Sequence, residues 1–224
     1  MIFPATPADH TRIKICGITH PDDAALAAEL GADALGLNFY PGSPRCLDLA
    51  RDGGWLRELP AGPSRIAVVV NAPLALIERL LGEGIVDAVQ LHGDEDESFC
   101  RSLQAAGLPF IKAIRVRDDE SVAAPERFGT DHLLLDAYRP DAYGGTGHTL
   151  DWTVAARFAA AHPGTILSGG LRPGNVAEAV RRVRPFAVDV ASGVEGEAGP
   201  RRKDPAKMRD LIAAVRTVRK NDPA

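Results

Sequence analysis

The chain alternates short apolar runs with segments of helical character eight times between residues 13 and 218. The predicted strands cover residues 13–18, 34–39, 66–70, 88–91, 110–114, 132–136, 165–167 and 186–190. The predicted helices cover residues 22–30, 47–59, 74–81, a segment that starts at 94, 120–128, 151–161, 173–183 and 204–218. Strands that alternate with helices pair in parallel, and the helices cover the sheet. Eight such units in 224 residues are typical of an α/β fold with a closed (β/α)8 arrangement, the TIM barrel.

An open, doubly wound sheet is the alternative for this alternation. The turn after the first predicted strand reads Cys16-Gly17-Ile18-Thr19 and lacks the GxGxxG pattern of dinucleotide-binding sheets. No GxxxxGKS/T segment of a phosphate-binding loop occurs anywhere in the chain. No linker, low-complexity run or change of composition divides the sequence. We therefore expect residues 1–224 to form a single (β/α)8 barrel domain, in which residues 1–11 are a short N-terminal extension.

Charge and cysteine content narrow the function class and the compartment. A formal net charge of −4 offers no basic surface for nucleic acid or for an acidic membrane. The three cysteines, Cys16, Cys46 and Cys100, have no CxxC spacing, which argues against a disulfide framework or a cysteine zinc site. Residues 1–10 contain no basic segment followed by an apolar run, so no signal peptide is predicted. These features predict a cytoplasmic protein.

Polar side chains gather where the predicted strands end. In a barrel, the loops that follow the strands converge on one face, and active sites lie there. We therefore expect these residues to meet at one mouth: Cys16, Asn38, Asn71, Gln90, His92, Arg115, Asp136, Ser168 and Ser192.

Cys16 and Asp136 are the two candidates for acid–base chemistry. Cys16 ends the first strand and is either a small buried hydrophobe or a base; a thiolate is competent if nearby cations lower its pKa. Lys14 lies two residues earlier, on the same strand face, and is expected to supply such a charge. Asp136 follows Leu133-Leu134-Leu135 and is either a cap for the next loop or a buried carboxyl that holds its proton as a general acid. An acid and a base tuned in opposite directions form a catalytic pair.

Two glycine turns and one arginine suggest how an anion is bound. Ser168-Gly169-Gly170 and Ser192-Gly193-Val194 follow the last two strands, where barrels often bind phosphate. Glycine lets backbone N–H groups approach a phosphate, although tight turns alone also explain these residues. Arg45 follows a proline-rich loop, and its guanidinium suits a ligand carboxylate or a solvated surface position.

Other polar features are open to simpler interpretations. His92 is either a base or a structural hydrogen-bonding residue, and the remaining histidines have no metal-ligand spacing. The basic run Arg201-Arg202-Lys203 is interpreted as a solvated turn. The glycine-rich loop 137–150 is the longest and is expected to close over a ligand.

Taken together, these segments resemble phosphoribosylanthranilate isomerases of tryptophan biosynthesis along nearly the whole chain. The resemblance is carried, in order, by the segments Lys14-Ile15-Cys16-Gly17-Ile18-Thr19, Phe39-Tyr40-Pro41-Gly42-Ser43-Pro44-Arg45, Val89-Gln90-Leu91-His92-Gly93, Leu134-Leu135-Asp136, Tyr143-Gly144-Gly145-Thr146-Gly147, Leu167-Ser168-Gly169-Gly170-Leu171 and Phe186-Ala187-Val188-Asp189-Val190-Ala191-Ser192-Gly193-Val194-Glu195. Any one of these segments is weak evidence, but the ordered set is highly specific.

The resemblance implies an Amadori rearrangement that uses no cofactor and no metal. N-(5-phosphoribosyl)anthranilate becomes 1-(2-carboxyphenylamino)-1-deoxyribulose 5-phosphate. Asp136 matches the general acid that protonates the ribose ring oxygen, and Cys16 matches the general base that takes the C2 proton. Arg45 matches the arginine that holds the anthranilate carboxylate. The phosphate site matches the turns that contain Gly169, Gly170, Ser192 and Gly193.

Two other functions remain as alternatives. The histidine-pathway isomerase runs the same chemistry with aspartates at the ends of strands one and five, where this chain has Cys16 and Arg115. A non-catalytic sugar-phosphate binder keeps the glycine turns but has no use for Cys16 and Asp136 together. The small-molecule substrate is the only partner expected, with a monomer as the default state and a homodimer as the alternative.

Overall fold

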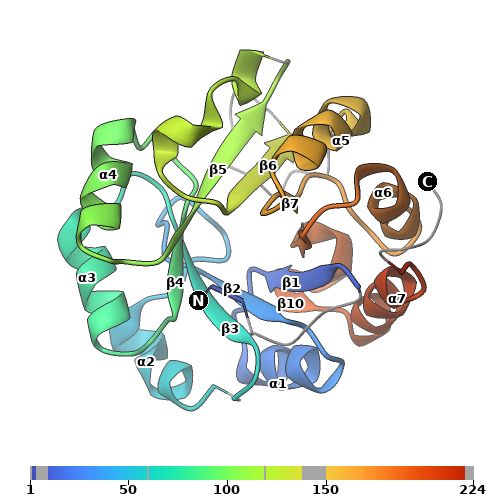
Figure 1. The fold of residues 1–224 in the computed structure, drawn as a ribbon. Coiled ribbons are helices and arrows are strands. Elements are labelled where there is room, and N and C mark those ends of the chain that lie inside the picture. The colour runs from blue at the N-terminus through green and yellow to red at the C-terminus, as the bar shows by residue number, and fades with distance from the viewer. Residues whose placement is uncertain (1, 4–9, 60, 119, 138–149, 220–224) are drawn as a thin grey trace.

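The structure, a computed structural model, describes residues 2–3, 10–59, 61–118, 120–137 and 150–219. Eight parallel strands pair in chain order, and the last pairs with the first, so that the sheet closes into a barrel (Figure 1). The strands are β1 (Arg12–Cys16), β2 (Ala34–Asn38), β3 (Ser64–Val69), β4 (Ala88–Leu91), β5 (Phe110–Val116), β6 (Leu133–Ala137), β7 (Ile166–Leu167) and β8 (Ala187–Val190). The prediction of a (β/α)8 barrel is confirmed.

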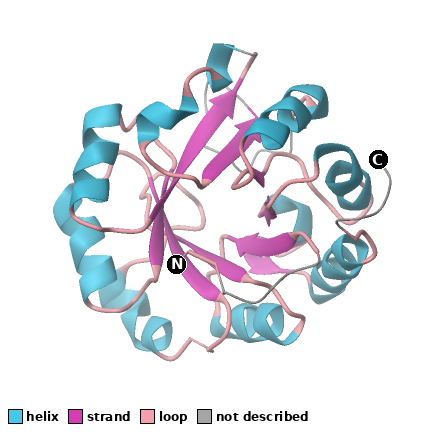
Figure 2. Ribbon diagram, in the orientation of Figure 1, coloured by secondary structure: helices cyan, strands magenta, loops and turns pink. Residues whose placement is uncertain are grey.

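Helices form an outer ring around the barrel (Figure 2). They are α1 (Pro21–Glu29), α2 (Leu49–Arg57), α3 (Leu74–Gly82), α4 (Glu97–Ala105), α5 (Trp152–Ala161), α6 (Val176–Val183) and α7 (Pro205–Arg216). The side chain of Asp151 accepts a hydrogen bond from the Thr153 N–H at the start of α5, and Asp204 caps α7 in the same way. These aspartates begin their helices because a carboxylate satisfies N–H groups that the first turn leaves unpaired.

The prediction of one helix over residues 120–128 is wrong. Two short 3-10 helices lie there instead, η1 (Glu120–Val122) and η2 (Pro125–Phe128). Ala124 separates them with a left-handed φ of 48°. A proline disfavours helical geometry in the residue before it, so Pro125 ends one turn and begins the next.

A small antiparallel hairpin after β8 was not predicted. A 3-10 turn, η3 (Ser192–Val194), leads into β9 (Glu195–Gly196), which pairs with β10 (Gly199–Lys203). Arg201 and Arg202 are exposed, but the side chain of Lys203 is 1% exposed. The interpretation of Arg201-Arg202-Lys203 as a solvated turn is therefore wrong for Lys203, which pairs with a carboxylate inside the protein.

Apolar side chains form two clusters. The larger one fills the layer between the strands and the helices. The smaller one is built from the alternate strand positions Ala34, Ile66, Ala88, Ile111, Ala113, Leu134, Ile166 and Ala187. Ile2 and Phe3 are buried in this second cluster, so part of the segment expected to be an extension packs against the barrel. None of the helices in the described part of the chain is long and apolar enough to span a bilayer.

Candidate active site

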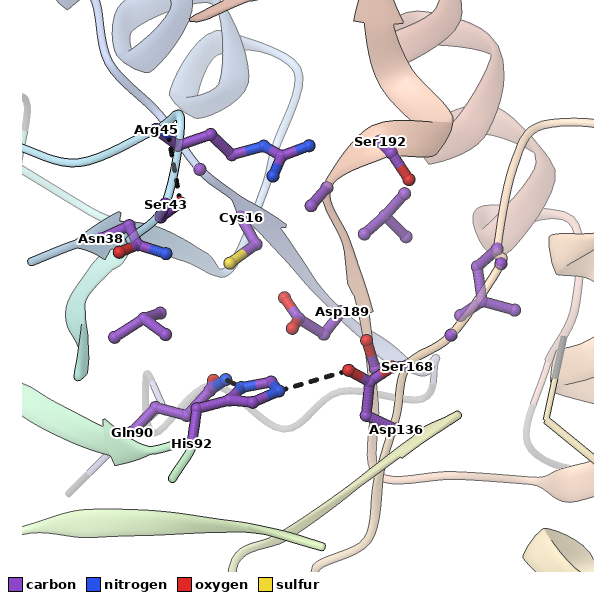
Figure 3. Close-up of a pocket in the computed structure, with 17 residues that line it drawn as sticks. Cys16, Asn38, Ser43, Arg45, Gln90, His92, Asp136, Ser168, Asp189 and Ser192 are labelled. Carbon is purple, nitrogen blue, oxygen red and sulfur yellow. Dashed lines mark hydrogen bonds and ion pairs between the residues drawn. The ribbon is translucent and has the colours of Figure 1, made fainter. Parts of the chain in front are cut away.

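A pocket opens at the carboxyl ends of the strands (Figure 3). Side chains and backbone from seven of the eight strands and their loops line it: Cys16, Gly17, Asn38, Ser43, Arg45, Val68, Gln90, His92, Asp136, Ser168, Gly169, Gly170, Leu171, Asp189, Val190, Ala191 and Ser192. Seven of the nine predicted strand-end residues are in this set. The predicted convergence on one mouth is thus confirmed for these seven.

Asn71 and Arg115 do not line the pocket, and for them the prediction is wrong. Both side chains bind the loop residue Asp94 instead. Asn71 Oδ1 accepts a hydrogen bond from the Asp94 N–H at 2.8 Å, and the Arg115 guanidinium pairs with the Asp94 carboxylate. Their partner lies in the loop after β4, and neither side chain is part of the pocket lining.

Cys16 ends β1, and its thiol projects into the pocket (Figure 3). Its register partner on β2 is Gly36. A Cβ atom on Gly36 would lie 2.6 Å from the Cys16 sulfur, closer than real contacts allow. Glycine at this position therefore makes the space that the thiol occupies. Lys14 is fully buried on the same strand and donates a hydrogen bond to Asp189 Oδ1 at 2.8 Å.

The expected lowering of the Cys16 pKa is wrong. Burial raises the pKa of the thiol, and the carboxylate of Asp189 raises it further. The ammonium groups of Lys14 and Lys203 lower the pKa, but their effect is smaller than the sum of the two opposing causes. Lys14 does supply the positive charge that its strand position predicted, yet Asp189 pairs with that charge and faces the same thiol.

Asp136 lies in β6, with only 3% of its surface exposed. Its Oδ1 accepts a hydrogen bond from the Ala137 N–H at 2.9 Å, and its Oδ2 lies 3.2 Å from His92 Nε2. The Nδ1 atom of His92 lies 2.7 Å from Gln90 Nε2. Asp136 thus accepts a hydrogen bond from the backbone that follows it, and it is also the first of three buried side chains in contact, Asp136, His92 and Gln90. Gln90 Oε1 is buried without a partner among the described residues.

Arg45 also lines the pocket, and its side chain is only 12% exposed, so the solvated alternative is excluded. Its Nε donates to Glu195 Oε1 at 2.5 Å, and its Nη2 donates to Oε2 at 2.9 Å. The arginine stem lies over Gly17, where a Cβ atom would come within 2.4 Å of Arg45 Cδ. Gly17 has a φ of 73°, so this position favours glycine for two reasons.

Glu195, Lys203 and Asp189 were not predicted as members of the site. Lys203 Nζ donates to Glu195 Oε1 at 3.3 Å. Burial tends to raise the pKa of Glu195, but the hydrogen bond from Arg45 and the charge of Lys203 lower it below its ordinary value. Burial lowers the pKa of Lys203, against the opposing effect of Glu195. A signal existed for Asp189 alone, because a carboxylate inside an otherwise apolar parallel strand needs a buried partner.

The two glycine turns lie side by side at the pocket. Gly169 and Gly170 have φ values of 90° and 65°, and both line the pocket with Ser168 and Ser192. Gly193 lies just beyond the lining, and a Cβ atom there would be 1.9 Å from the Leu171 carbonyl oxygen. The positive φ values favour glycine at positions 169 and 170, and close backbone packing requires it at position 193. Binding of a phosphate by these turns stays a prediction.

The long loop and metal binding are the remaining features of the sequence analysis. Residues 138–149 of the long glycine-rich loop lie outside the described part of the chain, so its closure over a ligand stays a prediction. Within the described ranges, no group of three or more His, Cys, Asp or Glu side chains is placed to hold a metal ion.

Comparisons with known proteins agree along most of the chain. A family model described as N-(5'phosphoribosyl)anthranilate (PRA) isomerase matches residues 13–214. An N-(5'-phosphoribosyl)anthranilate isomerase from Neisseria gonorrhoeae is 47% identical over 206 residues, which cover 91% of this chain and 96% of the relative. One from Pelobacter propionicus is 43% identical over 208 residues, 93% of this chain and 97% of the relative.

Solved structures give the same result. The phosphoribosyl anthranilate isomerase from Thermotoga maritima has a TM-score of 0.83 and 36% identity, over 93% of this chain and all of that chain. A phosphoribosyl anthranilate isomerase in complex with reduced 1-(o-carboxyphenylamino)-1-deoxyribulose 5-phosphate has a TM-score of 0.80, 35% identity and the same coverage. The chain therefore belongs to the N-(5'-phosphoribosyl)anthranilate isomerase family, and it is an isomerase of tryptophan biosynthesis.

Proposed function

We propose that the pocket at the carboxyl ends of the strands is where this isomerase rearranges its substrate, with Asp136 as general acid and Cys16 as general base. The observation that carries the proposal is the convergence of both side chains, Arg45 and the glycine turns on one pocket (Figure 3). The substrate, N-(5-phosphoribosyl)anthranilate, carries a phosphate, a carboxylate and a reacting sugar carbon. The pocket offers a matching group for each.

The reaction begins with ring opening. The neutral ring oxygen is a poor leaving group, so Asp136 donates a proton to it as the bond to C1 breaks. The anthranilate nitrogen supplies the electron pair, and a protonated Schiff base forms at C1. Asp136 is left as a carboxylate, which His92 Nε2, 3.2 Å away, is placed to stabilise by donating a hydrogen bond.

The second step moves the double bond. The thiolate of Cys16 takes the proton from C2, and the electrons neutralise the Schiff base to give an enolamine. This intermediate loses the proton of its C2 hydroxyl and gains one at C1, which yields the ketone. Because the pKa of Cys16 is raised, its thiolate is a minor form near neutral pH but a stronger base than an ordinary thiolate.

Binding groups hold the substrate for both steps. The turns with Gly169, Gly170, Ser192 and Gly193 bind the phosphate, and Arg45 binds the anthranilate carboxylate. The phosphate lies far from the reacting carbons, so its binding energy serves to position the sugar.

The test follows the fluorescence of the anthranilate group while phosphoribosylanthranilate, generated in situ, is consumed. Wild type, Cys16→Ser and Asp136→Asn are compared, with Cys46→Ser as a control for a cysteine outside the pocket. We expect wild type and the control to be active and both site variants to lose several orders of magnitude. Loss in only one site variant means that the two-residue mechanism must be redrawn.

Binding measurements separate this proposal from the two alternatives. A sugar-phosphate binder without activity keeps its ligand affinity in Cys16→Ala and shows no turnover in wild type. An enzyme with the histidine-pathway substrate turns that compound over in a parallel assay. Either result, with no isomerisation of phosphoribosylanthranilate by wild type, contradicts the proposal.

We further propose that the enzyme works in the cytoplasm, as a single domain and as a monomer. Cys16 must remain a free thiol, as it is in the structure, which suits the reducing cytoplasm. Residues 1–224 act as one barrel domain, and a monomer is sufficient for the reaction because one chain supplies all the groups named above. Light scattering at working concentrations tests the monomer, and a mass of two chains contradicts it.

A further inference from the structure

We propose that Glu195 is a positioning residue that fixes one edge of the Arg45 guanidinium and leaves the other edge for the carboxylate of the substrate. The inference rests on the role proposed above for Arg45 and adds a residue that the sequence did not point to. Glu195 does not need to touch the substrate. It acts through the orientation of the arginine.

The hydrogen-bond geometry divides the guanidinium into two edges. Glu195 accepts from Nε at 2.5 Å and from Nη2 at 2.9 Å, which together occupy the side-on edge. A guanidinium has five N–H donors in a fixed plane. Three of them, two on Nη1 and one on Nη2, are not used by Glu195. The Nη1–Nη2 edge can therefore hold a second carboxylate in a two-point contact.

Glu195 is itself held in place by two lysines of the neighbouring chain segment, Lys203 and Lys207. Lys203 Nζ donates to Glu195 Oε1 at 3.3 Å and to the Ala191 carbonyl at 3.1 Å. Lys207 Nζ donates to the backbone carbonyl of Glu195 at 2.8 Å. Glu195 and Lys203 belong to the paired strands β9 and β10, so the hairpin keeps both side chains in place.

The arginine is constrained along its stem as well as at its tip. Its Cδ lies over Gly17, where even a Cβ atom would come within 2.4 Å. A long side chain held at both its stem and one guanidinium edge loses little further freedom when a ligand binds. The contact with Glu195 thus prepares Arg45 for a planar anion.

The net charge of the cluster distinguishes a Glu195 that positions Arg45 from a Glu195 that competes with the substrate carboxylate. Arg45 and Lys203 carry two positive charges against the one negative charge of Glu195, which leaves one positive charge for an incoming carboxylate. If Glu195 only competed with the substrate, its neutralisation would strengthen carboxylate binding, because the charge of the cluster would rise. If Glu195 positions Arg45, neutralisation weakens that binding despite the extra positive charge. The two roles predict opposite signs.

The experiment measures how strongly the site prefers a carboxylate. Two probes are titrated calorimetrically into each variant: reduced 1-(o-carboxyphenylamino)-1-deoxyribulose 5-phosphate and the same compound without its carboxyl group. Glu195→Gln is compared with wild type and with Glu197→Gln, an exposed residue of the same hairpin. We expect Glu195→Gln to reduce the ratio of the two affinities about tenfold, mainly by weakening the carboxylate probe, and Glu197→Gln to leave it unchanged.

An unchanged or increased preference in Glu195→Gln overturns the inference. An Arg45→Gln variant separates this failure from a failure of the proposed function. If Arg45→Gln keeps the preference, the role of Arg45 itself is wrong; if it loses the preference while Glu195→Gln keeps it, only Glu195 is excluded.

Glu195→Asp is a second variant, for the case that Glu195→Gln does not fold. Glu195→Asp keeps the charge but shortens the side chain by one methylene, so it cannot hold both arginine nitrogens as Glu195 does. It is expected to reduce the preference as well, while the affinity for the probe without a carboxyl group stays at the wild-type value. A wild-type preference in this variant contradicts the two-point geometry.

Discussion

Lys14 Nζ lies 2.8 Å from Asp189 Oδ1, and both side chains are at most 5% exposed. The two residues are register partners on β1 and β8, the strands whose pairing closes the barrel. Both charges also act on the pKa of Cys16: Asp189 raises it and Lys14 lowers it. One ion pair thus serves the closure of the fold and the electrostatics of the pocket.

Removing one partner of this pair is expected to destabilise the protein strongly. Lys14→Met leaves the carboxylate of Asp189 buried without its counter-ion, which typically costs about 3–5 kcal/mol in the free energy of unfolding. Urea unfolding followed by circular dichroism measures the change. The double variant Lys14→Met/Asp189→Leu is the control and should recover most of the loss, since it buries no lone charge. A single variant within about 1 kcal/mol of wild type would contradict the prediction.

The pH dependence of Cys16 alkylation should follow the two charges. The raised pKa means that the thiolate of folded wild type appears at higher pH than that of the unfolded chain. Asp189→Asn removes a negative charge and should lower the pKa, whereas Lys14→Gln removes a positive charge and should raise it. The rate of Cys16 modification by iodoacetamide against pH, read by peptide mass spectrometry, tests both signs. A shift of the Cys16 pKa in the same direction in both variants would exclude this electrostatic account.

Gly36→Ala is expected to impair activity beyond any loss of stability. The added methyl group would lie 2.6 Å from Cys16 Sγ and 2.9 Å from its Cα, so the thiol and its strand must move. Overpacking of this kind costs about 1–3 kcal/mol. Turnover is measured at a temperature where circular dichroism shows the variant to be fully folded.

Gly54→Ala is the matched control for Gly36→Ala. Gly54 is exposed within α2, and its added methyl group meets nothing within 4 Å. Alanine is favoured over glycine by about 1 kcal/mol inside a helix, so this variant should be slightly more stable and fully active. Full activity of Gly36→Ala would show that the thiol tolerates the displacement.

Two substitutions of His92 should differ because they imitate different ring nitrogens. Gln extends as far as Nε2, which lies 3.2 Å from Asp136 Oδ2, whereas Asn extends only as far as Nδ1, which lies 2.7 Å from Gln90 Nε2. His92→Gln can still donate to Asp136 and is expected to keep more of the wild-type kcat than His92→Asn. Steady-state kinetics with saturating substrate give the comparison. The reverse order would show that the contact with Gln90 matters more than the contact with Asp136.

Local patterns in the sequence were enough for the barrel and for most of the pocket. The period of apolar residues predicts each strand, and the carboxyl ends of parallel strands must share a face, which brings Cys16 and Asp136 to one mouth. The same reasoning failed at residues 120–128, where the apolar pattern was helical but Pro125 broke the helix. It also failed for Asn71 and Arg115, because a loop residue, Asp94, competes for their side chains.

The sequence alone determined the order of strands and helices, the closure of the barrel and the positions of Cys16 and Asp136, because these follow from short-range periodicity and chain topology. Only the tertiary structure decided which charges meet. Arg45 pairs with Glu195, 150 residues away, and Lys14 pairs with Asp189, 175 residues away. The direction of the Cys16 pKa shift depends on a sum of burial and opposing charges over such contacts, and no local pattern contains that sum.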